Sequence, residues 1–424
     1  MYAGKVQSEE NNMKLSLEGI KDKGKWEVAG IMLPGYDIEM AAKKAQETPR
    51  WAHFGIGNIF RIFIGSIADG LLEEGELDTA LTCVETFDYD VVDKIYRPFD
   101  NLGLSVVLNT DGTRDYKVLG AFGEAIKAQS TDPEQWNRLK EIFASPSLQL
   151  VSFTITEKGY ALTNPEGKYL PYVQADIDNG PDKATGAMGV VTAMLLERYK
   201  KGGTPLALVS MDNCSKNGSL LRSSVLTMTE EWLKKGYVDQ GFAGYVEDEN
   251  QVSFPWTMID KITPRPNPVI AADLKALGVE DMEPVETSKR TYIAPFVNGE
   301  DPQYLVIEDH FPNGRPALEK GKGVYLGSRD TVNKSERMKV TALLNPVHSA
   351  VAPLGVLLGE EYFATLINQD PKLMKLAKMV AYDEGMPMVP DPGILSPKDF
   401  ADELFQIRFV NEYLLDTNLR IVTD

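Results

Sequence analysis

Short apolar runs alternate with segments of helical periodicity along most of the chain. Continuous apolar runs near residues 51–57, 78–85, 148–156 and 205–213 have the length and composition of buried strands, and LSVVLNT (104–110) predicts another. Between them, FRIFIGSIADGLLEEG (60–75) and DKATGAMGVVTAMLLERYKKGG (182–203) carry apolar residues at helical spacing. This alternation predicts an α/β fold with a mostly parallel sheet and right-handed crossovers.

The pattern changes from about residue 336 onward. The stretches HSAVAPLGVLLG, EEYFATLINQ, PKLMKLAKMVAYDEG and PKDFADELFQIRFVNEYLL all have helical periodicity, and strand-like runs disappear. We therefore expect an all-helical domain over residues 334–424, after an α/β domain with an N-terminal extension over residues 1–333. The boundary lies beside RMKVTALLNPVH (337–348), an apolar stretch that contains a lysine, an asparagine and a histidine. Polar groups buried there need partners or do chemistry, and small-molecule sites tend to form between domains.

The segment HFGIGNIFR (53–61) carries the pattern G-x-G-x-x-F between the first clear strand and a helix. Gly55 would permit a tight turn, and Gly57 would let the backbone approach a pyrophosphate at the helix N-terminus. The residues that open this helix complete the expected cofactor contacts: Asn58, Ile59 and Phe60. An ordinary glycine turn is the structural alternative. The context of strand, glycines and helix favours a doubly wound, Rossmann-type domain that binds a dinucleotide.

The next predicted strand ends in an acidic residue, Glu85, with Asp88 close behind. A carboxylate at this position accepts hydrogen bonds from ribose hydroxyls and repels the 2′-phosphate of NADP. We therefore expect NAD as the cofactor and Glu85 as its ribose ligand. The gap from Gly55 to Glu85 is longer than the usual spacing of about 20 residues.

Charge and composition exclude several classes of protein. The 44 basic and 62 acidic residues give a formal net charge of −18, which disfavours nucleic acid and anionic membrane surfaces as partners. No apolar run approaches the roughly 20 residues that span a bilayer, so we expect no membrane helix. Cys83 and Cys214 provide no disulfide framework, which fits a reducing cytoplasm. Residues 1–16 lack an apolar core, so we expect a tail rather than a secretory signal.

Five motifs, in order along the chain, resemble the signature segments of the polyol-specific long-chain dehydrogenase/reductase family. They are TITEKGY (154–160), SMDNCSKNG (210–218), FPWTMIDKITP (254–264), IEDHFPNGRPALEKGKGV (307–324) and LLNPVHSA (343–350). The family includes mannitol 2-dehydrogenase, fructuronate reductase and tagaturonate reductase, and the resemblance runs from about residue 51 to the C-terminus. ETFDYDVVDKIYRPFDNL (85–102) and TVNKSERMKVTALLNPVH (331–348) look most like the branch of fructuronate reductase, or D-mannonate oxidoreductase.

The resemblance implies a metal-independent, NAD-dependent hydride transfer between D-mannonate and D-fructuronate. By match of motif, Lys339 would be the general base, and Asn213 and Asn345 would hold the developing oxyanion. His348 would hydrogen-bond a substrate oxygen. The remaining matched residues would bind the substrate further along its chain: Asp260 and Arg420.

These residue types suit the chemistry independently of the family. Oxidation of a secondary alcohol needs a base for the hydroxyl proton, and a lysine serves near neutral pH only where burial or a cation lowers its pKa from about 10.4. Amide N–H donors stabilise the alkoxide, or polarise the ketone in the reverse reaction. A substrate carboxylate would need a cation, for which Arg420 and Arg61 are candidates. The three histidines are too scattered for a zinc site: His53, His310 and His348.

The predicted site residues also have purely structural interpretations. Lys339 could be a surface lysine whose stem lies along a helix, and Asn345 before Pro346 could simply cap a helix. Three others could be a core histidine, a turn residue and one half of a solvated pair with Lys261: His348, Asn213 and Asp260. A tagaturonate reductase or mannitol 2-dehydrogenase is the alternative within the family. Outside it, the alternative is a nucleotide- or sugar-binding module without turnover.

The spacing around Lys339 differs from that of the family. Family members commonly place the lysine five residues before the asparagine and eight before the histidine, whereas here the separations are six and nine. At about 100° per residue, a regular helix would put Lys339 and His348 on opposite sides. Because Pro346 cannot donate an N–H and clashes with the preceding turn, we predict a break, a kink or a π-bulge near residues 342–345. The family also continues past TNLRIVTD with a serine and a lysine that bind substrate, so we expect a truncated chain.

Overall fold

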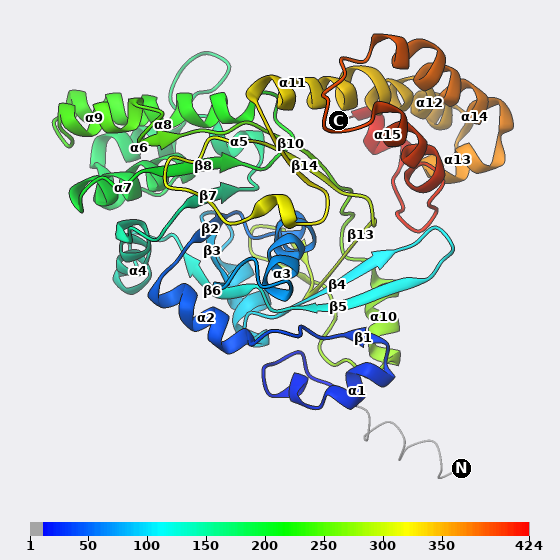
Figure 1. The fold of residues 1–424 in the computed structure, drawn as a ribbon, viewed down its shortest axis with the longest axis horizontal. Coiled ribbons are helices and arrows are strands. Elements are labelled where there is room, and N and C mark those ends of the chain that lie inside the picture. The colour runs from blue at the N-terminus through cyan, green and yellow to red at the C-terminus, as the bar shows by residue number, and fades with distance from the viewer. Residues whose placement is uncertain (1–11, 424) are drawn as a thin grey trace.

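A six-stranded parallel sheet forms the centre of the larger of two lobes (Figure 1). The computed structural model describes residues 12–423, so most of the expected N-terminal tail lies outside the described residues. The strands lie in the order β6 (Phe122–Lys127), β3 (Leu81–Glu85), β2 (Trp51–Phe54), β7 (Leu150–Phe153), β8 (Leu206–Ser210) and β9 (Val252–Ser253). This is the doubly wound order, with the reversal between β2 and β7. The predicted Rossmann-type domain is therefore confirmed.

The inner strands of this sheet, β3, β2, β7 and β8, are buried on both faces, whereas the edge strand β6 is partly exposed. Neighbouring side chains of a strand point to opposite faces, and in β2 Trp51 and Ala52 belong to two different core clusters. Cys83 and Val84 divide in the same way in β3. One face is covered by α4 (Pro133–Ala144), α7 (Ala187–Lys200), α8 (Asn217–Lys235) and α9 (Gln240–Glu247), and the other by α2 (Ile38–Glu47), η2 (Phe60–Gly65) and α3 (Ser66–Glu73). Burial on both faces explains why the inner strands are mostly apolar in sequence.

Three smaller sheets extend the α/β lobe. A mixed sheet has the order β1 (Ile31–Met32), β5 (Arg114–Leu119), β4 (Gly103–Leu108) and β13 (Phe296–Gly299). A second contains β10 (Thr257–Asp260), β14 (Tyr304–Glu308) and β15 (Val324–Gly327), and β11 (Val285–Glu286) pairs with β12 (Tyr292–Ile293). The strand expected at residues 104–110 is β4, which pairs with β5 and β13 and therefore lies outside the parallel sheet.

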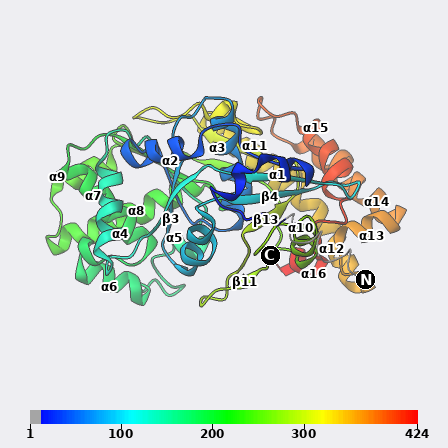
Figure 2. The ribbon, with the colours of Figure 1, turned by 90° about the horizontal axis from the view of Figure 1, so that it is seen from below.

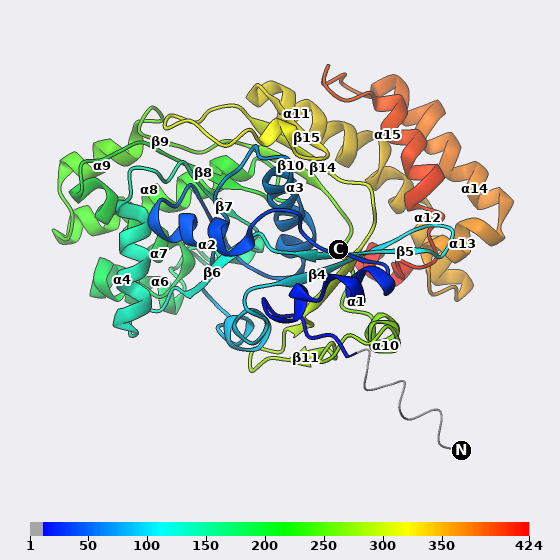
Figure 3. The ribbon, with the colours of Figure 1, turned by 60° about the horizontal axis from the view of Figure 1, so that its bottom comes forward.

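Short helices connect these strands in the α/β lobe. They are η1 (Gly19–Lys21), α1 (Lys23–Val28), η3 (Val92–Tyr96), η4 (Arg97–Phe99), α5 (Glu157–Tyr160), α6 (Pro171–Asn179), η5 (Pro181–Lys183), α10 (Pro268–Ala276) and η6 (Leu318–Lys320). The views from below and from an intermediate angle show α1 and α10 close to the β4–β5 ribbon (Figures 2 and 3).

The second lobe, residues 329–423, consists of helices joined by loops, with one isolated antiparallel bridge between Tyr362 and Thr417. It contains α11 (Arg329–Arg337), η7 (Met338–Leu343), α12 (Asn345–Leu358), α13 (Phe363–Gln369), α14 (Pro371–Lys378), η8 (Met379–Gly385), η9 (Met386–Met388), α15 (Pro397–Glu403), η10 (Leu404–Arg408) and α16 (Asn418–Thr423). Its first helix begins at Arg329, before the expected start at residue 334, because Ser328 caps it through the backbone N–H of Thr331. The division of the chain at residues 333 and 334 stays a prediction.

The helical lobe is tied to the sheets at several places. The tip of the β4–β5 ribbon reaches it (Figure 1), where the side-chain amide of Asn411 donates to the carbonyl of Leu108 at 2.8 Å. The helical run 329–358 is long and apolar enough to span a membrane by length and composition alone. Several of its residues, among them Met338, Leu343 and Val351, pack into the core of this lobe.

Candidate active site

The reversal point of the parallel sheet carries the glycines singled out in the sequence. In open α/β sheets, ligands bind outside the carboxyl ends of the strands at such a point. Gly55 follows β2 with φ +88°, and a Cβ placed on it would lie 2.4 Å from the carbonyl oxygen of Thr154, so only glycine fits. A Cβ on Gly57 would meet nothing within 4 Å. The open space beside Gly57 lets another group approach the backbone there.

The helix after these glycines begins at Asn58 and Ile59 and continues as the π-helical stretch η2. Asn58 accepts a hydrogen bond from Nη2 of Arg61 at 2.8 Å through its Oδ1. The Phe60 ring is fully buried and stacks on the ring of His53, with centroids 4.1 Å apart. Any contact of Phe60 with a dinucleotide must therefore come from its backbone, because the side chain belongs to the core.

Glu85 ends the strand beside β2 and lies close to the glycine loop. The backbone N–H of Gly55 donates to the carbonyl of Val84 at 3.0 Å, which joins the two strand ends. Burial raises the pKa of the Glu85 carboxyl, although backbone N–H groups, including that of Phe87 at 2.9 Å, oppose the shift. This carboxylate lies where the ribose of a dinucleotide is expected.

A buried hydrogen-bonded chain supports the glycine loop from below. Trp51 Nε1 donates to Ser152 Oγ at 2.7 Å, and His53 contacts Ser152 Oγ through Nδ1 at 2.6 Å and Thr154 Oγ1 through Nε2 at 2.8 Å. Thr154 Oγ1 in turn donates to the carbonyl oxygen of Gly55 at 2.7 Å. The sequence did not predict this role of His53. The available signal was a pair of hydroxyl residues two positions apart, Ser152 in β7 and Thr154 directly after it.

Lys339 lies between the two lobes, as the sequence predicted. Its side chain comes from η7, is only 9% exposed, and donates to the carbonyl of Ile259 at 2.7 Å and to Oδ1 of Asn213 at 3.1 Å. Oδ1 of Asp260 is 3.3 Å from the same amine. The structure therefore excludes the alternative of a surface lysine. It brings Lys339, Asn213 and Asp260 together from three separate segments.

The helix around Lys339 contains the expected irregularity. Residues Met338–Leu343 form a π-helix, in which the N–H of Leu344 donates to the carbonyl of Lys339 at 3.0 Å. This bond spans five residues, so one additional residue is accommodated in the turn. Of the alternatives open from the sequence, the structure shows the π-helical one.

The two other predicted residues of this segment lie on the following helix. Asn345 starts α12, is exposed, makes no side-chain capping bond, and has no side-chain hydrogen bond within residues 12–423. His348 packs its ring against Phe363 and Phe409, at centroid distances of 4.9 and 5.4 Å. Burial, helped by the nearby cation of Arg408, lowers the pKa of His348 to about 3, so its ring is neutral near pH 7.

Arg420 lies on α16 near His348. Its Nε and Nη2 atoms donate to Oδ1 of Asp416, at 2.8 and 2.5 Å. α16 packs against α12, the helix that carries His348, and the positive charge of Arg420 contributes to the lowered pKa of His348. The predicted substrate-binding arginine is thus at the same side of the helical lobe as the predicted histidine.

Asp260 is the centre of a buried charge network. It is 3% exposed, and its Oδ2 accepts from Nη1 of Arg408 at 2.7 Å. Burial alone would raise the pKa of Asp260, but Arg408 and then Lys339 hold it below the ordinary value. The solvated pair with Lys261 that the sequence allowed is wrong, because Lys261 Nζ instead donates to the carbonyl of Glu300.

Most of the chain matches two parts of one protein family. Residues 49–320 match the Mannitol dehydrogenase Rossmann domain, and residues 331–424 match the Mannitol dehydrogenase C-terminal domain. The chain belongs to the mannitol dehydrogenase family. It is therefore an oxidoreductase that acts on a secondary alcohol, and the resemblance described from the motifs is confirmed.

Three members of the family show how close the likeness is. A D-mannonate oxidoreductase of Thermotoga maritima is 49% identical over 413 residues, which are 97% of this chain and 76% of the relative. The substrate-free structure of a D-sorbitol dehydrogenase has a TM-score of 0.78 and 29% identity, and covers 93% of this chain and 75% of its own. The ternary complex of Pseudomonas fluorescens mannitol 2-dehydrogenase with NAD and D-mannitol has a TM-score of 0.75 and 26% identity, and covers 96% and 76%.

Arg61 does not lie in the substrate region of this mannitol dehydrogenase fold, contrary to one expectation. Its guanidinium is buried, donates to the carbonyls of Ala294 and Pro295 at 2.7 and 3.3 Å, and bonds Asn58. Burial lowers the pKa of Arg61 to about 10. Because these donors already serve the protein, Arg61 holds the dinucleotide helix against the segment before β13 and is not available for a substrate carboxylate.

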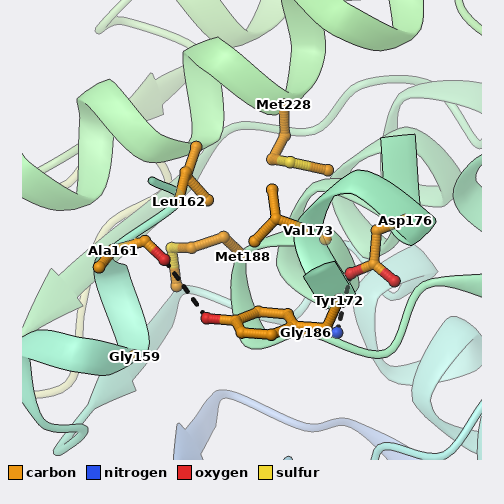
Figure 4. Close-up of a pocket in the computed structure, with 10 residues that line it drawn as sticks. Gly159, Ala161, Leu162, Tyr172, Val173, Asp176, Gly186, Met188 and Met228 are labelled. Carbon is orange, nitrogen blue, oxygen red and sulfur yellow. Dashed lines mark hydrogen bonds between the residues drawn. The ribbon is translucent and has the colours of Figure 1, made fainter. Parts of the chain in front are cut away.

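No group of three or more His, Cys, Asp or Glu residues that could hold a metal occurs between residues 12 and 423. A small cavity is lined by apolar residues from α6, α7 and α8, including Val173, Met188 and Met228 (Figure 4). The carboxylate at its edge, Asp176, accepts from the backbone N–H of Gly186 at 2.8 Å and so anchors the start of α7. This cavity contains none of the predicted site residues.

Proposed function

We propose that this protein is an NAD-dependent D-mannonate oxidoreductase, which interconverts D-mannonate and D-fructuronate. The observation that carries the proposal is the buried amine of Lys339, which crosses the seam between the lobes to reach Asn213 at 3.1 Å. The name of the Thermotoga maritima relative, at 49% identity, supports this substrate pair. The alternative of a surface lysine on a binding module would not require this buried contact.

The residues around Gly55 fit the dinucleotide. NAD, when bound, supplies the acceptor for the hydride, and the solved complex of the Pseudomonas fluorescens enzyme contains NAD. The loop at Gly55 and the open space at Gly57 would hold the pyrophosphate against the N-terminus of the helix at Asn58. The carboxylate of Glu85 would accept from the ribose hydroxyls and repel a 2′-phosphate.

In the oxidation of D-mannonate, Lys339 accepts the hydroxyl proton of the reacting carbon. The electron pair of the adjacent C–H bond leaves as hydride, and the carbon–oxygen double bond forms. To accept the proton, the neutral amine turns its lone pair to the substrate and gives up one of its contacts to Asn213, Ile259 and Asp260. Reduction of D-fructuronate runs through the same steps in reverse.

Two amide groups are suited to hold the negative charge on the oxygen. Asn213 uses its Oδ1 to accept from Lys339, which leaves its Nδ2 hydrogens for the substrate. Asn345 has no side-chain hydrogen bond among residues 12–423 and is exposed at the start of α12. Asn213 is held in place by Lys339, and a donor already in position costs no reorganisation when the charge develops. We assign both amides to the substrate oxygen.

The carboxylate end of the substrate would lie towards α16. His348 is neutral near pH 7 and can therefore both donate and accept hydrogen bonds with sugar hydroxyls. Arg420, beside it, is the candidate for the substrate carboxylate. We also propose a cytoplasmic role in hexuronate metabolism, in line with the acidic composition and the unpaired Cys83 and Cys214.

The test is NADH oxidation with three ketones: D-fructuronate, D-tagaturonate and D-fructose. We expect the highest kcat/KM with D-fructuronate, and the reverse reaction with D-mannonate and NAD. A higher kcat/KM with D-tagaturonate or D-fructose would reassign the substrate within the family. Tight NADH binding without turnover of any of the three would instead indicate a binding module.

A further inference from the structure

A row of side chains with alternating charge starts at Lys339 and crosses the interface between the two lobes. Lys339 Nζ is 3.3 Å from Asp260 Oδ1, Asp260 Oδ2 accepts from Arg408 Nη1 at 2.7 Å, and Arg408 Nη2 donates to Glu300 Oε1 at 2.6 Å. A second bond joins Arg408 Nε to Glu300 Oε2 at 2.9 Å. Arg408 is 4% exposed and Glu300 is not exposed at all. The row is therefore shielded from water and from salt.

The two lobes contribute the charges in alternation. The cations belong to the helical lobe, Lys339 on η7 and Arg408 at the end of η10. The anions belong to the sheets, Asp260 at the end of β10 and Glu300 directly after β13. Asp260 therefore contacts a cation of the opposite lobe through each of its two carboxylate oxygens.

We propose that Arg408 is a positioning residue for the proton transfer at Lys339. Arg408 compensates the charge of Asp260 on the side away from Lys339, so that the amine meets a neutralised carboxylate and can release its proton. Glu300 fixes the plane of the Arg408 guanidinium through the paired bonds. This inference rests on the proposed function of Lys339 as the general base.

The physical reason is the cost of leaving one buried charge unbalanced. When Lys339 is neutral, Asp260 loses one of its two cations and keeps Arg408. Without Arg408, the same step would leave Asp260 as a buried carboxylate without a cation, which is strongly unfavourable. Release of the proton from Lys339 would therefore be disfavoured in that variant.

The other ionisable groups around Lys339 do not take over this role. His348 is neutral near pH 7, and Lys261 donates to the backbone of Glu300 and not to Asp260. The groups that face the seam come from the following elements: β10 (Asp260), the segment after β13 (Glu300), α12 (His348), η10 (Arg408) and α16 (Arg420). Of these groups, Arg408 is the cation that contacts Asp260 directly. The other cation in contact with Asp260 is Lys339 itself.

The experiment measures kcat/KM for D-mannonate oxidation against pH, because the rising limb reports the pKa of the essential base in the free enzyme. For Arg408→Met we expect the limb to move upward by about one to three pH units, the effect of an uncompensated opposite charge at short range. For Glu300→Gln we expect a smaller downward shift, because the guanidinium then compensates Asp260 alone. Arg408→Lys, which keeps the charge, should keep the limb near its wild-type position.

A matched control separates this effect from a looser contact between the lobes. Asn411 is also buried, lies three positions from Arg408, and bridges the lobes through the carbonyl of Leu108, but makes no bond to Asp260. Asn411→Ala should lower the thermal midpoint and leave the limb in place. An equal shift in Asn411→Ala, or an unmoved limb in Arg408→Met, would overturn the proposal.

Further outcomes are equally decisive. If Arg408→Met does not fold, the pair Glu300→Gln and Arg408→Lys decides: a downward shift in the first with none in the second supports the role of Arg408. An unmoved or upward limb in Glu300→Gln overturns it. If the wild-type enzyme is active and all variants keep its pH profile, the role of Arg408 is refuted but the proposed function is not. A wild-type chain that binds NADH but turns over none of the sugars refutes the proposed function as well.

Discussion

Replacement of Lys339 by methionine removes the amine and keeps an unbranched apolar stem. If Lys339 is the general base, the variant loses the contribution of proton transfer, which is typically a factor of about 10² to 10⁴ in rate. At about 1.36 kcal/mol per tenfold change, this is about 3 to 5 kcal/mol of transition-state stabilisation. A lysine that only holds the lobes together would lower stability without this specific loss in kcat.

The structure predicts that Lys339→Met still folds. The change leaves the carbonyl of Ile259 without its 2.7 Å donor, which costs about 1 to 3 kcal/mol for a buried acceptor. Asp260 keeps its 2.7 Å bond to Arg408, so no carboxylate is left buried without a cation. The glycine loop at Gly55 is built by other segments. We therefore expect an unchanged dissociation constant for NADH.

The assay combines steady-state kinetics in both directions with NADH binding measured by fluorescence. Lys261→Met is the matched control, because Lys261 neighbours Asp260 in sequence and is partly buried but bonds the backbone of Glu300. We expect this control to keep kcat within a factor of a few. The assignment of the base would be refuted if Lys339→Met retained more than about a tenth of the wild-type kcat with the pH-dependent limb intact.

Three further predictions concern other parts of the site. Asn345→Ala should lower kcat about 10²- to 10³-fold and change the free energy of unfolding by less than about 0.5 kcal/mol. The exposed Ser349→Ala is the control. An unchanged kcat in Asn345→Ala would show that Asn345 is not part of the site. Gly55→Ala should lower both the thermal midpoint and NADH affinity, whereas Gly57→Ala, whose Cβ meets nothing within 4 Å, should weaken only the affinity; titration with NADH and a melting curve distinguish them. Burial and the cation of Arg408 lower the pKa of His348 to about 3, below the unfolded value of about 6.5. The contribution of the neutral His348 ring to the free energy of unfolding is therefore complete above about pH 6.5. This contribution is lost as the pH falls towards 3, by up to about 1.4 kcal/mol per pH unit. Urea unfolding at several pH values should give a flatter dependence for His348→Gln, and parallel curves would contradict this account.

The sequence predicted the inner strands of the central sheet because these strands carry their own signal. Strands such as β2 and β7 are buried on both faces, so most of their residues are apolar and the strands are recognisable without any knowledge of their partners. The edge strands β6 and β9 were not predicted, because β6 is only partly buried and β9 has two residues. The mixed sheet was not predictable in this way. β4 pairs with β13, far along the chain, through contacts such as Leu104 with Phe296. A pairing over that sequence distance leaves no local pattern.

The residues of the candidate site also differ in whether the sequence alone could predict their roles. Lys339 was recognisable because an isolated lysine in an apolar stretch needs an explanation, and the structure gives it buried partners. Arg408 also lies in an apolar helical pattern, but its partner Asp260 is 148 positions away. No local feature of the sequence therefore distinguishes Arg408 from a residue on an ordinary helix surface. The role of Glu300 depends on Arg408 and was invisible for the same reason.

The π-helical turn at Lys339 decides which side chains can act together. In a regular helix, nine residues at about 100° each place His348 about 180° from Lys339, on the opposite side. The bond from Leu344 to the carbonyl of Lys339 takes one residue out of that progression. The effective separation then corresponds to eight residues, or about 80°. Lys339 and His348 can therefore face the same substrate, although they are one residue further apart in the sequence than in the family. The π-helical turn compensates for the additional residue.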